Sequence, residues 1–67
     1  MKEILEKKGI KVIDERPNSC KCEYNKNKII LELNSGLSYN YRLNINNKTI
    51  LTRGSLMTCI TKILNYK

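Results

Sequence analysis

The three cysteines carry the most reactive side chains of the sequence, and their spacing limits the chemistry open to them. Cys20 and Cys22 flank Lys21, so on a strand both thiols would point to one face, while Cys59 falls in an apolar helical pattern. A zinc site would need a fourth ligand, and the chain has no histidine to supply one. A disulfide is disfavoured by the odd number of cysteines and by a reducing compartment. We therefore predict three buried thiols that hold no metal.

Groups that could catalyse a reaction are scarce in the rest of the sequence. Without histidine the chain cannot form a Ser-His-Asp or Cys-His triad, and its three glycines are too far apart for a phosphate-binding loop. Asp14 and Glu15 are neighbouring carboxylates, but consecutive residues of a strand point to opposite faces and would not meet on one substrate. The sequence therefore predicts a protein that is not an enzyme and needs no cofactor.

Arg53, Gly54 and Ser55 precede an expected helix, and this arrangement has two interpretations. The free N–H groups of a helix N-terminus, an arginine and a hydroxyl could together hold a phosphate. The simpler interpretation is that Gly54 permits the turn from strand to helix and Ser55 caps the helix, which is the commoner role of such a serine. We favour the cap and keep Arg53 and Ser55 among the candidate binding residues.

The charge of the chain is strongly basic and unevenly distributed. Thirteen Lys and Arg stand against six Asp and Glu, which gives a net charge of +7. Residues 1–32 have a net charge of +2, and residues 33–67 have a net charge of +5 without an acid. AT-rich codons would explain part of the excess of Lys, Asn and Ile, but they do not explain why every acid falls in the first half. The asymmetry favours an anionic partner for the second half.

Hydrophobic periodicity divides the chain into two helices and a run of strands. The expected helices cover residues 2–8 and 56–64, and the expected strands cover residues 10–15, 20–24, 29–33, 38–45 and 49–53. Gly9 ends the first helix, and Asn-rich turns at 25–28 and 46–48 close two hairpins. In the second hairpin, Tyr39, Tyr41, Leu43 and Ile45 would face inward with Ile50.

The fold class that follows is α+β. We expect a small antiparallel β-meander of four or five strands, a short N-terminal helix, and an amphipathic C-terminal helix packed on the sheet. A chain of 67 residues is long enough for one domain, so residues 1–67 are expected to form a single small basic domain with a small core.

The outward face of the second hairpin and its surroundings provide the candidate binding residues. Arginine and asparagine side chains can form paired hydrogen bonds with base edges, and lysines can neutralise phosphates of any sequence. The alternative interpretation is an ordinary solvated sheet face. The candidates for a nucleic-acid or partner site are Asn40, Arg42, Asn44, Lys48, Arg53, Ser55 and Lys62.

Ile30 and Leu51 are expected on the sheet face away from the helix. Clustered there, they would mark a dimer or partner surface, unless the N-terminal helix folds over that face and covers them.

Two functions of different classes remain open. The first is a small protein without catalytic activity that binds nucleic acid through its basic second half. The alternative is a small inhibitor or adaptor of the phage or mobile-element type, similar to anti-CRISPR proteins, that docks on a protein or nucleoprotein target. The longest purely apolar run has three residues, and the N-terminus carries acids, so we expect a cytoplasmic protein that contacts no membrane.

Overall fold

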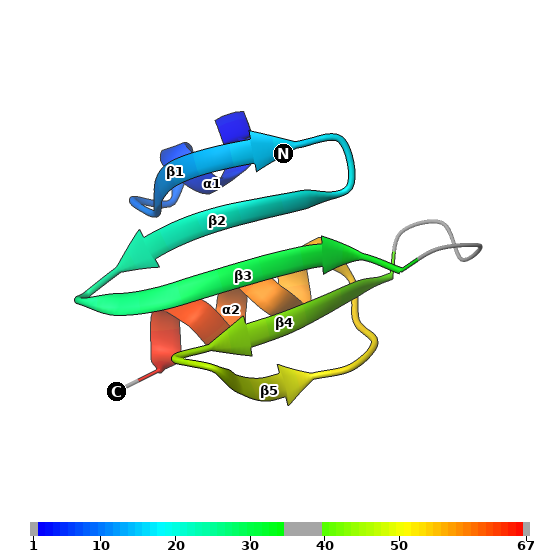
Figure 1. Ribbon diagram of the computed structural model, residues 1–67. Coiled ribbons are helices and arrows are strands. Elements are labelled where there is room, and N and C mark those ends of the chain that lie inside the picture. Colours follow the sequence, from blue (N-terminus) through cyan, green and yellow to red (C-terminus); the bar gives the residue numbers. More distant parts are fainter. Residues whose placement is uncertain (1, 35–39, 67) are drawn as a thin grey trace.

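The computed structural model describes residues 2–34 and 40–66, which form two helices and five strands (Figure 1). The elements in chain order are α1 (Lys2–Lys7), β1 (Lys11–Arg16), β2 (Ser19–Tyr24), β3 (Asn27–Leu33), β4 (Tyr41–Ile45), β5 (Lys48–Leu51) and α2 (Leu56–Asn65). The expected α+β fold with an antiparallel meander is confirmed. The start of the strand expected over residues 38–45, including Tyr39, lies outside the described residues.

The sheet is a meander in which neighbouring strands in the sequence are neighbours in space, in the order β1-β2-β3-β4-β5. The β2–β3 and β4–β5 hairpins close through two-residue turns. In each turn the two residues have φ values of 52° and 68°, at Asn25-Lys26 and at Asn46-Asn47. Positive φ at both positions matches a type I′ turn, whose twist suits a two-residue hairpin, and asparagine tolerates this conformation better than most residues.

Asn46 joins the two turns, which lie at the same end of the sheet. Its Oδ1 accepts a hydrogen bond from the Lys28 N–H at 2.9 Å, and its Nδ2 donates to Asn27 Oδ1 at 3.0 Å. Its own N–H donates to the Lys28 carbonyl at 2.8 Å. One side chain therefore fixes the position of the second turn against the start of β3.

Both helices pack on the same side of the sheet, the far side in Figure 1. Leu5 of α1 is fully buried in the same apolar cluster as Cys59, Ile60 and Ile63 of α2. The N-terminal helix therefore does not cover the opposite face, which corrects one of the two arrangements considered from the sequence. The inward strand residues of the cluster are Cys20, Cys22, Ile29, Leu31, Leu43 and Ile45.

The entry into α2 confirms the capping role of Ser55. Its Oγ accepts a hydrogen bond from the Thr58 N–H at 3.1 Å and lies 3.0 Å from Thr58 Oγ1. Gly54 lies directly against Leu51, and a Cβ at this position would collide with the Leu51 side chain. A larger residue at this position would therefore require the end of the Leu51 side chain to move.

Leu51 is on the helix side of the sheet, which corrects the expectation that it faces away. Leu51 lies opposite Leu43 while Thr49 lies opposite Asn44, so Ile50 is an extra residue in β5. An extra residue shifts the alternation of the strand, so the side chains after it point to the face opposite the one that regular alternation predicts. Both Ile50 and Leu51 consequently pack against the core, and Ile30 is left without its expected partner on the other face.

A second register shift occurs in the other edge strand. Val12 lies opposite Cys22 and Asp14 lies opposite Lys21, so Ile13 is the extra residue of β1. Val12 packs against the core, whereas Ile13 is 60% exposed. Each edge of the sheet therefore carries a bulge.

In the described ranges, no helix is long and apolar enough to cross a membrane.

Candidate nucleic-acid interface

The candidate residues predicted from the sequence do not form one surface. Arg42 is exposed, donates from Nη2 to Thr49 Oγ1 at 3.2 Å, and lies directly opposite Glu32 of β3. Asn40 also lies at the start of β4, where its carbonyl accepts a hydrogen bond from the Asn34 N–H. One acid of the first half of the chain, Glu32, therefore stands next to Arg42 of the second half.

Arg53 and Ser55 share the end of the sheet where β4 starts, since both lie between the end of β5 and the start of α2. Asn44 lies in the middle of the sheet, on the face away from the helices, opposite Ile30 and Thr49. Lys48 and Lys62 are exposed at the opposite end, at the start of β5 and in the last turn of α2. The seven predicted residues thus divide between the two ends and the middle of the molecule.

Lysines from both halves of the chain lie at the end of the molecule where β1, β3 and β5 begin, which is on the left in Figure 1. The cause is the meander: β1, β3 and β5 all begin at this end, and α2 finishes there. We call this surface the lysine end. It consists of the exposed side chains of Lys11, Lys26, Lys28, Lys48 and Lys62.

The lysine end carries little negative charge. Glu23 lies opposite both Lys11 and Lys28 and is the acid that the strand register places there. The last turn of α1, which also ends on this side, adds Glu6 together with Lys7 and the following Lys8. The lysine end therefore keeps a clear excess of positive charge.

The other end of the sheet has mixed charge. The three arginines of the chain, Arg16, Arg42 and Arg53, lie there with Asp14, Glu15 and Glu32. Arg16 Nε donates to Asp14 Oδ2 at 3.3 Å, and Glu15 Oε2 accepts from the Lys2 backbone N–H at 3.0 Å. The carboxylates at this end partly neutralise its cations.

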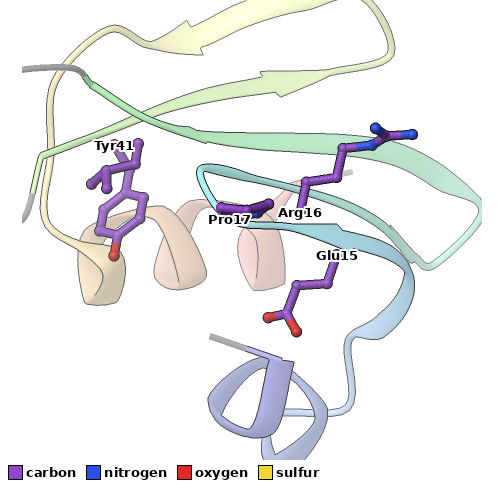
Figure 2. Close-up of a pocket in the computed structure, with 5 residues that line it drawn as sticks. Glu15, Arg16, Pro17 and Tyr41 are labelled. Carbon is purple, nitrogen blue, oxygen red and sulfur yellow. The ribbon is translucent and has the colours of Figure 1, made fainter.

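A pocket of about 430 Å³ opens at this mixed end, lined by Glu15, Arg16, Pro17, Leu33 and Tyr41. Figure 2 shows Glu15 and Tyr41 on the side of the helices, whereas the Arg16 side chain extends to the other side of the sheet. The guanidinium is therefore turned away from the Glu15 carboxylate. The pocket offers one carboxylate and no paired catalytic groups.

The cysteines are buried, as predicted. Cys20, Cys22 and Cys59 are each at most 2% exposed, and the Sγ atoms of Cys20 and Cys22 lie 3.4 Å apart. Burial raises the pKa of all three thiols, so the protonated form is favoured at neutral pH. Within residues 2–34 and 40–66, no three side chains of the His, Cys, Asp or Glu types are grouped to hold a metal ion.

Sequence reasoning missed Lys11, Lys26 and Lys28 because it compared the two halves of the chain instead of the two ends of the sheet. The strand boundaries contained the missing signal. In a meander, the first residues of alternate strands meet at one end, and Lys11 and Lys48 begin β1 and β5 while Lys28 is the second residue of β3.

Comparison of the chain with protein-family models, with curated proteins and with solved structures finds no match.

Proposed function

We propose that this protein binds nucleic acid through the lysine end, by neutralising phosphates without catalysing a reaction. The observation that carries the proposal is that five exposed lysines lie at one end of the molecule. Three of them belong to strands β1, β3 and β5, one to the turn between β2 and β3, and one to α2. Lysine is a point charge that suits phosphate and does not read base identity. The proposal is therefore for binding that depends little on sequence.

The spacing of the lysines supports this partner. Lys11, Lys28 and Lys48 lie on alternate strands β1, β3 and β5, and two strand spacings are about 10 Å. The three positions therefore span about 20 Å, and with 3.4 Å between base pairs this corresponds to about six base pairs of a duplex. Lys11 and Lys28 lie on the sheet face away from the helices, whereas Lys48, opposite Ile45, lies on the helix side, so the three lysines flank the end of the sheet from both faces. The hydrogen bonds of Asn46 hold the turn between β4 and β5 against β3, so the spacing of Lys28 and Lys48 is fixed before any partner arrives.

Salt-dependent binding to a labelled 20-base-pair duplex of mixed sequence tests the proposal. Replacing Lys11, Lys28 and Lys48 by glutamine should reduce the log–log slope of affinity against salt by about 2.7, since each lost phosphate contact removes about 0.9. The matched control replaces Arg16, Lys21 and Arg53 by glutamine, which removes the same charge elsewhere. All six side chains are exposed, so neither variant removes core packing.

The control should keep a slope close to that of the unmodified chain. Equal losses in the two triple variants would show that only net charge matters and would contradict a lysine-end site. The absence of binding to duplex or single strands at low salt would reject nucleic acid as the partner.

One observation favours the alternative of an inhibitor or adaptor that docks on a protein. A shallow groove of about 500 Å³ runs between β5 and α2, lined by Ile50, Thr58, Thr61, Lys62, Asn65 and Tyr66. Its lining combines apolar and polar side chains, which could receive side chains of a partner protein. A pull-down with and without nuclease separates the two functions, because a protein partner retained after nuclease treatment would favour docking.

A further inference from the structure

The sheet face opposite the helices is uncovered by the described parts of the chain. We call it the open face. Strand register assigns to it the side chains of Lys11, Asp14, Arg16, Ser19, Lys21, Glu23, Lys28, Ile30, Glu32, Arg42, Asn44 and Thr49. Ile13, the extra residue of β1, joins this face because it lines a hollow there with Ile30 and Asn44. A sheet with one uncovered face needs water or a partner on that face.

The apolar part of the open face pairs a protruding side chain with a hollow. Ile13 is 60% exposed, more than Met57 at 54% or Ile4 at 44%. Beside it lies a shallow hollow of about 250 Å³, whose lining includes Ile13, Ile30 and Asn44. A surface with a protruding residue next to a hollow is suited to a two-fold contact, in which each copy fills the hollow of the other.

Asn44 adds an unused hydrogen-bond acceptor at the same place. Its Oδ1 is buried and has no hydrogen-bond partner, and the residue lines the hollow. A buried amide oxygen without a donor is costly, and most such groups in folded proteins are paired. A donor of a second copy could reach this buried oxygen only after the Asn44 side chain rotates toward the open face.

The open face shares Lys11 and Lys28 with the lysine end, but the rest of its charges differ from those of that end. The face has five basic side chains and three acidic ones, which interleave across the strands. Lys11, Glu23 and Lys28 form one row across the strands, and Glu32 lies opposite Arg42. A nucleic acid would meet three repulsive carboxylates here, whereas a second copy presents both signs in the same mixed pattern.

We propose that the open face binds a second copy of this chain in a two-fold dimer. Five strands about 4.8 Å apart and about six residues long give a face of about 24 by 20 Å, so the dimer would bury on the order of 1,000 Å² in total. That area lies at the lower limit of specific interfaces. The dimer therefore forms and dissociates with concentration and is not permanent.

Sedimentation equilibrium between about 5 and 500 μM tests the proposal on the full chain. The mass should rise from one chain of 7.8 kDa toward two, and Ile13→Glu should return it to one chain throughout. Met57→Glu is the matched control, because Met57 has similar exposure but lies on α2. It should leave the association unchanged.

A second measurement uses the unmodified chain and does not depend on how a variant folds. In a mixture of isotope-labelled and unlabelled protein, intermolecular magnetisation transfer should appear at the methyl groups of Ile13 and Ile30. One mass at all concentrations, equal effects of Ile13→Glu and Met57→Glu, or intermolecular contacts only at other residues would each overturn the proposal. A dimer abolished only by Ile13→Glu would support it.

Discussion

Cys22 shows how a single side chain links burial to the behaviour of the protein in alkaline solution. It is 2% exposed and lies opposite Ile29, with Cys20 Sγ 3.4 Å away. Burial raises its pKa above the ordinary value of 9.0, and the neighbouring Cys20 thiol raises it further. The folded protein therefore holds this proton at a pH where the unfolded chain releases it.

We predict that alkaline pH destabilises the fold through these thiols. A raised pKa in the folded state contributes stability that is present below the unfolded pKa and is lost as the pH rises above it. Above about pH 9, each buried thiol should reduce the free energy of unfolding by up to about 1.4 kcal/mol per pH unit. Urea unfolding between pH 7.5 and 10 measures this loss.

Cys22→Ala provides the comparison for this prediction. The variant is less stable at every pH because it loses packing, but its stability should fall less steeply above pH 9. An unchanged slope would show that the thiol does not control the alkaline loss.

α1 has only six residues, but it belongs to the core. A helix of this length is not stable alone, and its attachment rests on Leu5, which is fully buried, while the neighbouring Ile4 is 44% exposed. Gly9, with a φ of +85°, ends the element and lets the chain turn into β1. Among the described residues of the helix, Leu5 is the side chain that buries it in the core, and the hydrogen bond from the Lys2 N–H to Glu15 adds a polar contact with β1.

We predict that Leu5→Ala lowers the free energy of unfolding by about 2–5 kcal/mol, as expected for truncation of a buried leucine. Ile4→Ala, in the same helix, should change it by less than about 0.5 kcal/mol, which is usual for surface positions. Thermal and urea unfolding measure both variants. Similar losses at the two positions would show that Leu5 is not the attachment point.

The two type I′ turns offer a second matched pair. Asn25 and Asn46 are both first turn residues with a φ of 52°, but only the Asn46 side chain is seen to bond to the adjacent strand, at Lys28 and Asn27. Asn46→Ala should therefore cost about 1 kcal/mol more than Asn25→Ala, given the usual value of such hydrogen bonds. Equal costs in urea unfolding would indicate that the asparagines matter only for turn conformation.

Hairpins, helices and the inward face were predictable from the sequence because alternation and helical spacing are local signals. The bulges were not. A strand pattern such as Lys48 to Arg53 gives no sign that Ile50 is an extra residue, yet this residue decides the face of Leu51. The candidate site was predicted only in part, at Lys48 and Lys62, because charge was compared along the chain and the meander rearranges it in space.

At the scale of the whole molecule, the charged lysines of the lysine end repel one another, and added salt should weaken this repulsion. Two lysines about 10 Å apart in water repel by about 0.4 kcal/mol, and 0.1 M salt screens most of this because the Debye length is also about 10 Å. We predict that the melting temperature rises as NaCl increases from 10 to 300 mM. Calorimetry or circular dichroism measures the change.

The charge-matched triple variants test where this repulsion lies. Replacing Lys11, Lys28 and Lys48 by glutamine should raise the melting temperature at low salt and flatten its salt dependence. Replacing Arg16, Lys21 and Arg53 by glutamine should produce neither change. The three carboxylates at the mixed-charge end of the sheet already offset the positive charge there. A flatter salt dependence in the second variant alone would place the repulsion elsewhere.

The bulges at Ile13 and Ile50 also determine how the sheet can grow. A regular edge strand is a template on which a further strand, and then a fibril, can be added. Here both outer strands are interrupted, one by each extra residue, so neither edge presents an unbroken ladder of donors and acceptors. Sideways polymerisation is therefore disfavoured in both directions, and the route left to self-assembly is stacking, which ends after two copies.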